Sequence, residues 1–167
     1  MKQQIAAIKS VMQRAPNEIG AIAVAHYKQN FVLGGFVDDT LRPWKKRKKE
    51  TKQTLGRALL VKRAKLKNSI RVFSKNEQQI VLGSDVVYAR IHNEGGVITQ
   101  YERSELFVRN RNKKGFYKKG IKAGKGNTYG KRTIRIPKRQ FIGDSIALRR
   151  KMDKWYLQNL KAANVIN

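Results

Sequence analysis

The sequence predicts an α+β protein in which an antiparallel β-sheet is packed by N-terminal and C-terminal helices, with a long basic loop or hairpin arm. Three observations lead to this prediction. Apolar residues recur at helical spacing near both termini, they alternate with polar residues in the middle of the chain, and a Gly- and Lys-rich stretch follows. At 167 residues the chain can bury a core, so we expect a single domain over residues 1–167 that includes a basic arm at about 102–131.

Two helices are expected in the first fifth of the chain. Residues 3–14 carry apolar residues at helical spacing, and a second amphipathic stretch runs to about Phe31. Pro16 separates them, because proline interrupts a helix but suits the first turn of the next one. Gly34 and Gly35 then end the second helix, since glycine readily takes the left-handed conformation that closes helices.

A loop and a shorter helix are expected between residues 36 and 66. The loop contains Pro43, Trp44 and a dense basic run at residues 45–49. In residues 54–66 several leucines lie near helical spacing, although Gly56 weakens the helix.

Strand patterns follow. Residues 69–83 alternate apolar and polar side chains around a turn at 75–77, which predicts a β-hairpin. Further strands are expected at residues 97–101 and 132–136, the latter ended by Pro137.

Two more helices are expected, each with a polar residue at its start. Residues 84–93 are expected to begin at Ser84 or Asp85 and to turn Val87, Tyr88 and Ile91 inward. The C-terminal helix begins after Asp144 or Ser145. Its expected apolar contacts are Ile146, Met152, Trp155, Tyr156 and Leu160.

The net charge indicates the kind of partner. Thirty-eight basic residues against eleven acidic ones give +27, and such self-repulsion favours a polyanion or an acidic protein as neighbour. Nucleic acid is the leading polyanion, because Lys and Arg contacts to phosphate release counterions whatever the base sequence. The sequence contains no base-reading module, so any contact with double-stranded DNA is expected to be non-specific.

The candidate contacts lie in two basic segments, and residues 109–139 hold thirteen basic residues and no acidic one. We expect this arm to stay mobile until it meets a partner. Whether it binds DNA or an acidic face of a neighbouring protein stays open. The candidate residues are Lys45, Lys46, Arg47, Lys48, Lys49, Arg109, Arg111, Lys113, Lys114, Lys118, Lys119, Lys122, Lys125, Lys131 and Arg132.

No catalytic residue, metal site or cofactor is predicted. His92 and Glu94 flank a turn without a second histidine nearby, and a metal set of His26, His92 and Glu94 has no recognised spacing. We expect His92 and Asn93 to satisfy backbone groups at a helix end, while a following glycine takes a positive φ.

Other classes of protein are disfavoured. The chain has no cysteine, so it forms no disulfide or thiolate metal site. The acids at residues 38, 39 and 85 are expected to cap or solvate turns rather than bind magnesium. We also expect no signal peptide and no membrane span, since no stretch approaches the ~18 apolar residues that a span requires.

The order of the motifs resembles the phage virion morphogenesis family, the tail-completion proteins of Mu-like and related tailed phages. The resemblance covers roughly residue 30 onward and rests on "ALLVKRAKLKNSI", "YARIHNEGG" and "IPKRQFIGDS". The chain departs from the family at Lys65, where members often carry glycine. The matching motif residues are Tyr88, His92, Asn93, Gly95, Gly96, Pro137, Arg139 and Phe141.

The resemblance implies a non-enzymatic virion protein that resides in the host cytoplasm during assembly. Such a protein completes the tail and joins it to the DNA-filled head, as a homo-oligomeric ring, expected to be a hexamer, around the DNA channel. Its implied partners are head-completion, tail-terminator or tube proteins and channel DNA. We call "IPKRQFIGDS", residues 136–145, the docking segment. In it, Arg139 would pair with a carboxylate and Phe141 would anchor in a core or interface. The alternative is a non-specific nucleic-acid-binding protein associated with ribosomes or the nucleoid.

Overall fold

The computed structural model describes residues 2–47, 50–52, 54–105 and 127–166. It divides into two compact units, which we describe separately. The helical unit runs up to Gly95 and resumes at Pro137, and the arm unit comprises Gly96–Ile136. Helices and antiparallel strands are both present, so the predicted α+β class is confirmed.

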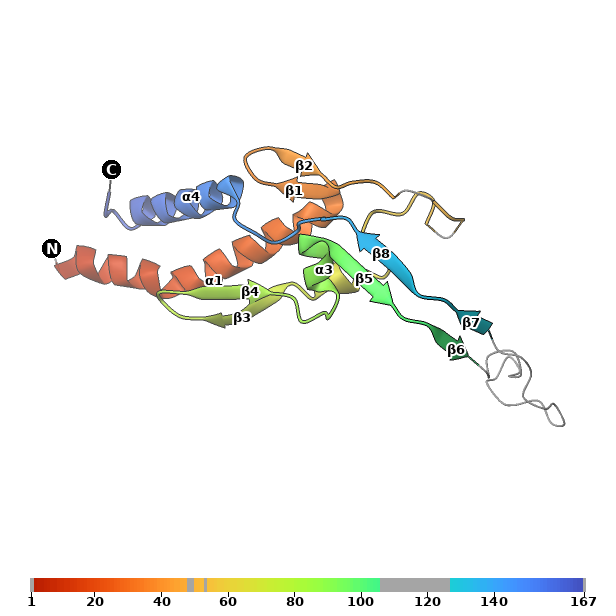
Figure 1. The fold of residues 1–167 in the computed structure, drawn as a ribbon. Coiled ribbons are helices and arrows are strands. Elements are labelled where there is room, and N and C mark those ends of the chain that lie inside the picture. Colours follow the sequence, from red (N-terminus) through yellow and green to blue (C-terminus); the bar gives the residue numbers. More distant parts are fainter. Residues whose placement is uncertain (1, 48–49, 53, 106–126, 167) are drawn as a thin grey trace. The chain divides into compact units, whose positions relative to one another are not determined.

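In the helical unit two long helices, α1 and α4, lie side by side (Figure 1). The hairpins β1–β2 and β3–β4 and the short helix α2 contact α1. The elements of this unit are α1 (Lys2–Leu33), β1 (Gly35–Val37), β2 (Leu41–Pro43), α2 (Lys65–Asn68), β3 (Arg71–Lys75), β4 (Ile80–Gly83), α3 (Ala89–Glu94) and α4 (Ile146–Ala162).

The arm unit consists of two antiparallel strand pairs. Strand β5 (Gly96–Gln100) pairs with β8 (Arg132–Ile136), and β6 (Arg103–Glu105) pairs with β7 (Asn127–Tyr129). The strands predicted on both sides of the basic stretch are therefore confirmed. Residues 106–126, which hold most of the predicted basic arm, lie outside the described residues.

Aromatic rings build the core of the helical unit at the C-terminal end of α1. Phe31 and Phe141 are each 1% exposed, and Trp44 is 6% exposed. The Phe31 ring meets Trp44 edge-on at 5.4 Å between centroids and lies 5.2 Å from Phe141. Because buried aromatic side chains dominate core energetics, this cluster anchors α1 against the segment that precedes α4.

The predicted break at Pro16 is wrong, because α1 continues through it. An internal proline removes one helical hydrogen bond and costs roughly 3 kcal/mol. Val11, Ala15 and Ile19, on both sides of Pro16, are buried, and burying a side chain such as Val or Ile contributes roughly 1.5–3 kcal/mol. Burial on both sides of the proline therefore keeps the helix continuous.

The predicted helix at residues 54–66 is also wrong. Gly56, Leu60 and Ala64 all have positive φ, and only the short α2 follows. The physical reason lies outside the segment. The Arg47 guanidinium donates to the carbonyls of residues 54, 57 and 58, which are acceptors that a helix would have used internally.

Three smaller predictions need correction. The expected loop after residue 35 contains the β1–β2 hairpin. Helix α3 begins at Ala89, because Ser84 instead accepts a bond from the Val86 amide in a preceding turn. Val87 is 98% exposed rather than inward, and Val86 and Ala89 are buried in its place.

Other predictions are confirmed by the structure. The β3–β4 hairpin forms with its turn where expected, and α1 ends at Gly34, whose φ is +67°. At the start of α4 the Ser145 hydroxyl accepts from the Leu148 amide at 3.1 Å, as a helix cap does. The predicted apolar contacts of α4 need correction. Leu148 is the buried residue of this helix but was not among them, and Ile146, which was among them, is 44% exposed.

Candidate functional site

Two sequence motifs that lie far apart in the chain meet in the helical unit. The Asn93 side-chain oxygen accepts from the amides of Phe141 at 2.9 Å and Ile142 at 3.1 Å. The His92 carbonyl accepts from the Arg139 amide at 2.8 Å. His92 and Asn93 therefore satisfy backbone groups, as expected, but these belong to residues 139–143, which we call the clamped segment.

The opposite side of the clamped segment is held by three side chains from the N-terminal part of the chain. Trp44 donates to the Gln140 carbonyl at 2.7 Å, Asn30 to the Phe141 carbonyl at 3.0 Å, and Tyr27 to the Gly143 carbonyl at 2.8 Å. Buried backbone groups need such partners where no strand pairs with them. Sequence reasoning missed this role; the available signal was the position of Asn30, a polar residue, near the apolar stripe of a predicted helix.

His26 and Ser145 lie within hydrogen-bond distance but form no accessible catalytic pair. Their Nε2 and Oγ atoms are 3.1 Å apart, and both residues are buried. The Ser145 hydroxyl is already engaged, since it donates to the Val37 carbonyl and caps α4. Burial, followed by the positive charge of Lys151, lowers the pKa of His26, which keeps the ring neutral. The pair is therefore a structural link between α1 and α4.

His92 and Glu94 do not act together either. Glu94 is exposed and paired with Arg90 at 3.0 Å, and Gly95, with φ +77°, ends α3 as expected. The Nδ1 atom of His92 is buried and has no hydrogen-bond partner among the described residues. Burial, and then the charge of Arg139, lowers its pKa. Within the described part of the chain, no three His, Cys, Asp or Glu side chains are grouped to hold a metal ion.

The aspartates considered for magnesium binding are engaged by arginines. Asp38 pairs with Arg42 at 2.8 Å and also accepts from the Ile146 amide at the start of α4. Asp39 pairs with Arg150 at 2.5 Å, and Asp85 pairs with Arg71 at 2.9 Å. They link elements or brace turns, in agreement with the structural interpretation of these acids.

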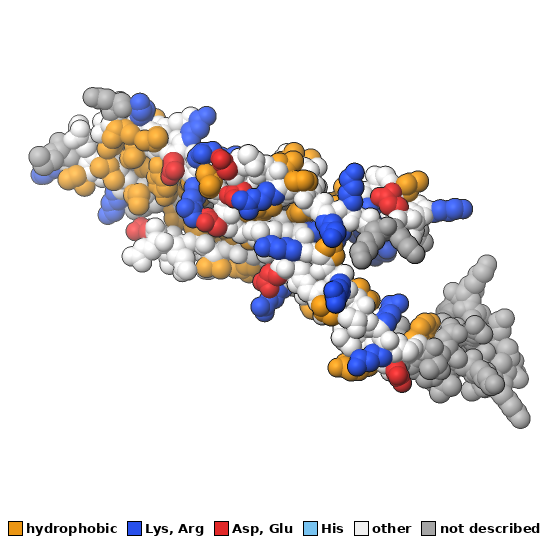
Figure 2. Space-filling view, turned by 45° about the horizontal axis from the view of Figure 1, so that its top comes forward, with side chains coloured by type: hydrophobic (Ala, Val, Ile, Leu, Met, Phe, Trp, Pro, Cys, Tyr) orange, Lys and Arg blue, Asp and Glu red, His pale blue; other side chains and the backbone are white. Residues whose placement is uncertain are grey.

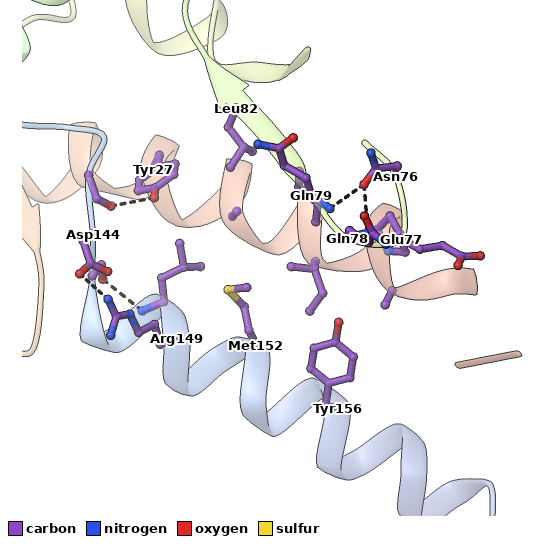
Figure 3. A pocket seen from close by; sticks show the side chains of 18 residues that line it. Tyr27, Asn76, Glu77, Gln78, Gln79, Leu82, Asp144, Arg149, Met152 and Tyr156 are labelled. Carbon is purple, nitrogen blue, oxygen red and sulfur yellow. Dashed lines mark hydrogen bonds and ion pairs between the residues drawn. The ribbon is translucent and has the colours of Figure 1, made fainter. Parts of the chain in front are cut away.

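A groove of about 410 Å³ lies between α1, α4 and the β3–β4 turn (Figure 3). Met152 and Tyr156 project from α4 toward it, and Gln79 lies on the opposite side. Tyr27 and the Asp144–Arg149 ion pair lie at one end. Its lining is largely apolar, so the groove does not explain the strong positive charge.

A second concavity, of about 350 Å³, is strongly basic, and we call it the basic pocket. None of the described residues that line it is acidic. Its lining residues come from the basic run, the irregular segment before α2, and the region around α3. They are Arg47, Leu60, Lys62, Arg63, Lys65, Leu66, Tyr88 and His92.

The predicted contact residues are only partly described. Lys45 and Lys46 are exposed, whereas Arg47 is half-buried and holds the neighbouring loop. Lys131 and Arg132 are exposed in the arm unit. The candidates at residues 48, 49 and 109–125 lie outside the described residues. Figure 2 shows Lys and Arg side chains spread over the visible face, with Asp and Glu side chains scattered among them.

The two predicted residues of the docking segment differ in outcome. Phe141 is buried in the aromatic core, as one of the two expected environments. Arg139 is 9% exposed and has no carboxylate partner among the described residues; its Nε atom donates to the Lys45 carbonyl at 3.0 Å. The expected pairing of Arg139 with a carboxylate is thus not found within the described residues.

Comparison with known proteins identifies the family. None of the described helices has the length and hydropathy that a membrane crossing requires. Neither the curated proteins nor the solved structures include a significant match. The sequence model of the phage virion morphogenesis family matches residues 38–161, which include both motifs that meet at the clamped segment. The chain therefore belongs to the phage virion morphogenesis family, a structural family that is not known to be enzymatic.

Proposed function

We propose that the chain is a tail-completion protein of the phage neck, which joins the completed tail to the DNA-filled head. In this proposal it forms a homo-oligomeric ring, with six copies, around the DNA channel. Family membership supports a role in the virion, and the net charge of +27 is the observation that carries the more specific assignment.

The charge supports this assignment because the chain cannot neutralise itself. Six ion pairs among the described residues each join a carboxylate to an arginine. These six carboxylates are more than half of the eleven acidic residues, so few remain to neutralise the other basic side chains. Copies in a ring would repel one another unless other molecules supplied negative charge. Channel DNA and acidic faces of the head-completion, tail-terminator or tube proteins would supply it.

The proposed DNA contacts are non-specific and come from exposed basic side chains. Lys45 and Lys46 in the helical unit, and Lys131 and Arg132 in the arm unit, are exposed in the described residues. Contacts of this type act on phosphates and release counterions, so they hold DNA without reading its sequence. That behaviour suits a channel through which the whole genome passes.

A conditional knockout of the gene in the phage tests the proposal. We expect DNA-filled heads and separate tails to accumulate, as seen by electron microscopy, and purified wild-type particles to contain the protein. Adding the purified protein to the mutant lysate should restore joined particles. Joined, infectious particles formed without the protein would refute the role in completion.

The alternative is a free nucleic-acid-binding protein, which the net charge alone would also suit. Sedimentation and salt-dependent DNA binding distinguish the two. A neck protein should sediment as a ring or join tails as a monomer, whereas a free binder should bind any duplex as a monomer or dimer with a steep salt dependence. Absence from purified particles, combined with DNA binding in cells, would favour the alternative.

A further inference from the structure

Arg139, a largely buried cation with no carboxylate partner among the described residues, lies near two residues that line the basic pocket, Arg47 and His92. Arg139 is 9% exposed, and the side-chain hydrogen bond that it forms among the described residues joins Nε to the Lys45 carbonyl. Buried charges are normally paired with an opposite charge, because desolvation without a partner is costly. In the part of the chain that the structure describes, no carboxylate offsets the buried charge of Arg139.

Two further polar side chains, Arg47 and His92, lie close to Arg139. The charge of Arg47 is close enough to lower the pKa of Arg139, after the larger effect of burial, and Arg139 in turn lowers the pKa of His92. Arg47 forms a long ion pair with Glu50, at 4.0 Å, and the Glu50 side chain is half exposed. The buried Nδ1 of His92 has no partner among the described residues. Arg47 and Arg139 therefore form a pair of neighbouring positive charges beside His92, and Arg139 has no carboxylate partner among the described residues.

Two of these three residues also line the basic pocket. Arg47 and His92 form part of its wall, and Lys62, Arg63 and Lys65 are exposed around it. Leu60, Leu66 and the partly exposed ring of Tyr88 add apolar surface. A ligand that fills this concavity must therefore carry negative charge and an apolar group together.

We propose that the basic pocket binds an acidic segment of another protein, one that places an Asp or Glu carboxylate among the basic side chains and an apolar side chain against Leu60 and Tyr88. The identity of that protein as a neighbouring virion component rests on the proposed function; the chemistry of the pocket does not.

Duplex DNA fits the pocket less well than a protein segment does. Its outer surface offers phosphates and sugars, while its bases are stacked inside, so the apolar lining would stay unfilled. A second copy of this chain is also a poor ligand, because six of its carboxylates already pair with its own arginines in the described residues. Charge complementarity and the apolar lining together favour an acidic segment of a different protein.

Binding of synthetic probes to the full chain tests the proposal. The first probe is a short peptide that alternates glutamate and leucine, the second replaces each leucine with serine, and the third is a duplex oligonucleotide. The pocket variant is K62Q/R63Q/K65Q, and the control variant K2Q/K9Q/K154Q removes the same charge from exposed positions on α1 and α4. Thermal melts of both variants confirm that they are folded.

We expect the pocket variant to weaken binding of the Glu–Leu peptide by about tenfold or more, and the control variant to weaken it only slightly. The Glu–Ser peptide should bind the wild type more weakly than the Glu–Leu peptide. Equal weakening by both variants would show that bulk charge alone attracts the peptide and would overturn the proposal. Selective loss of duplex binding in the pocket variant, with peptide binding retained, would identify a DNA site and overturn it as well.

The pocket proposal and the proposed neck function can fail independently of each other. If the peptide fails to bind but the knockout still blocks head–tail joining, the pocket proposal fails and the neck assignment stands. If the peptide binds through the pocket but the protein is absent from particles, the neck assignment fails and the pocket proposal stands.

Discussion

At the scale of single residues, polar side chains hold the clamped segment where no strand pairs with it. Asn93 accepts from two backbone amides on one side, and Asn30 donates to a carbonyl on the other. Asn30 is fully buried and also accepts from the Val37 amide, so one side chain connects α1 to two separate stretches of backbone. Asn93, the asparagine of the family motif, therefore stabilises the fold and has no catalytic part in this arrangement.

The role of Asn93 predicts a large effect of its truncation. In Asn93→Ala the amides of Phe141 and Ile142 lose their acceptor, and an unsatisfied buried donor costs about 1–3 kcal/mol. We expect the free energy of unfolding, measured by urea denaturation, to fall by about 2–4 kcal/mol. Asn68→Ala, at an exposed position of α2, is the matched control and should change it by less than about 0.5 kcal/mol. Similar values for the two variants would contradict the clamp.

The buried histidine His26 predicts how stability depends on pH. Its folded pKa is lowered from 6.5, so the unfolded chain binds the proton more readily than the folded chain does. The stability that this group contributes is therefore complete above pH 6.5 and is lost as the pH falls from there toward the folded pKa. His92 has a pKa shift of the same sign.

Melting temperatures between about pH 5 and pH 7 check this prediction. The wild-type melting temperature should fall on acidification within this range, and the fall should be smaller in His26→Gln, which removes the titrating ring. His92→Gln serves as the companion variant for the second histidine. An equal fall in the wild type and in both variants would place the titration elsewhere, in carboxylates for example.

At the scale of elements, local sequence patterns correctly predicted the helices and strands that local interactions determine. The β3–β4 hairpin, the strands β5 and β8, and the capped helix α4 were all predicted from periodicity and turn residues. The failures have distant causes. Helix α1 passes through Pro16 because of tertiary burial, and residues 54–64 stay irregular because Arg47 engages three of their carbonyls. The apolar or polar pattern of a single segment reveals neither the residues that bury α1 nor the arginine that binds these carbonyls.

The arm is an element whose removal should spare the fold. The described side chains of the arm unit include no buried residue, and the core of buried residues lies in the helical unit. Deleting residues 112–128 should therefore change the free energy of unfolding by less than about 1 kcal/mol, while head–tail joining or DNA retention is impaired. A strong loss of thermal stability in this deletion would show that the segment belongs to the core.

A second variant separates the charge of the arm from its length. Replacing the six lysines at 113, 114, 118, 119, 122 and 125 with glutamine keeps the chain length. If charge is what the arm contributes, this variant should assemble as poorly as the deletion. Normal assembly of the glutamine variant would assign the arm a contact that does not depend on charge.

At the scale of the whole molecule, the candidate site could be predicted only in part. The sequence alone pointed to His92, Asn93 and residues 136–143, and the structure joins them through Asn93 and the His92 carbonyl. The basic pocket was not predicted, because its walls come from Arg47, residues 60–66 and Tyr88, which meet only in the folded chain. Charge runs are visible in a sequence, whereas a concavity among them is not.

The net charge of +27 predicts that salt stabilises this protein. The exposed ion pairs are each worth about 0–1 kcal/mol, so screening them loses little, whereas repulsion acts among many unpaired cations. The screening length falls from about 10 Å at 0.1 M salt to about 3 Å at 1 M. The melting temperature should therefore rise with sodium chloride, which is preferred to sulfate because sulfate also strengthens apolar burial. The six-lysine variant carries less positive charge, so its melting temperature should rise less. If the melting temperature of the wild type instead falls with added sodium chloride, attractive ion pairs outweigh repulsion in the folded chain.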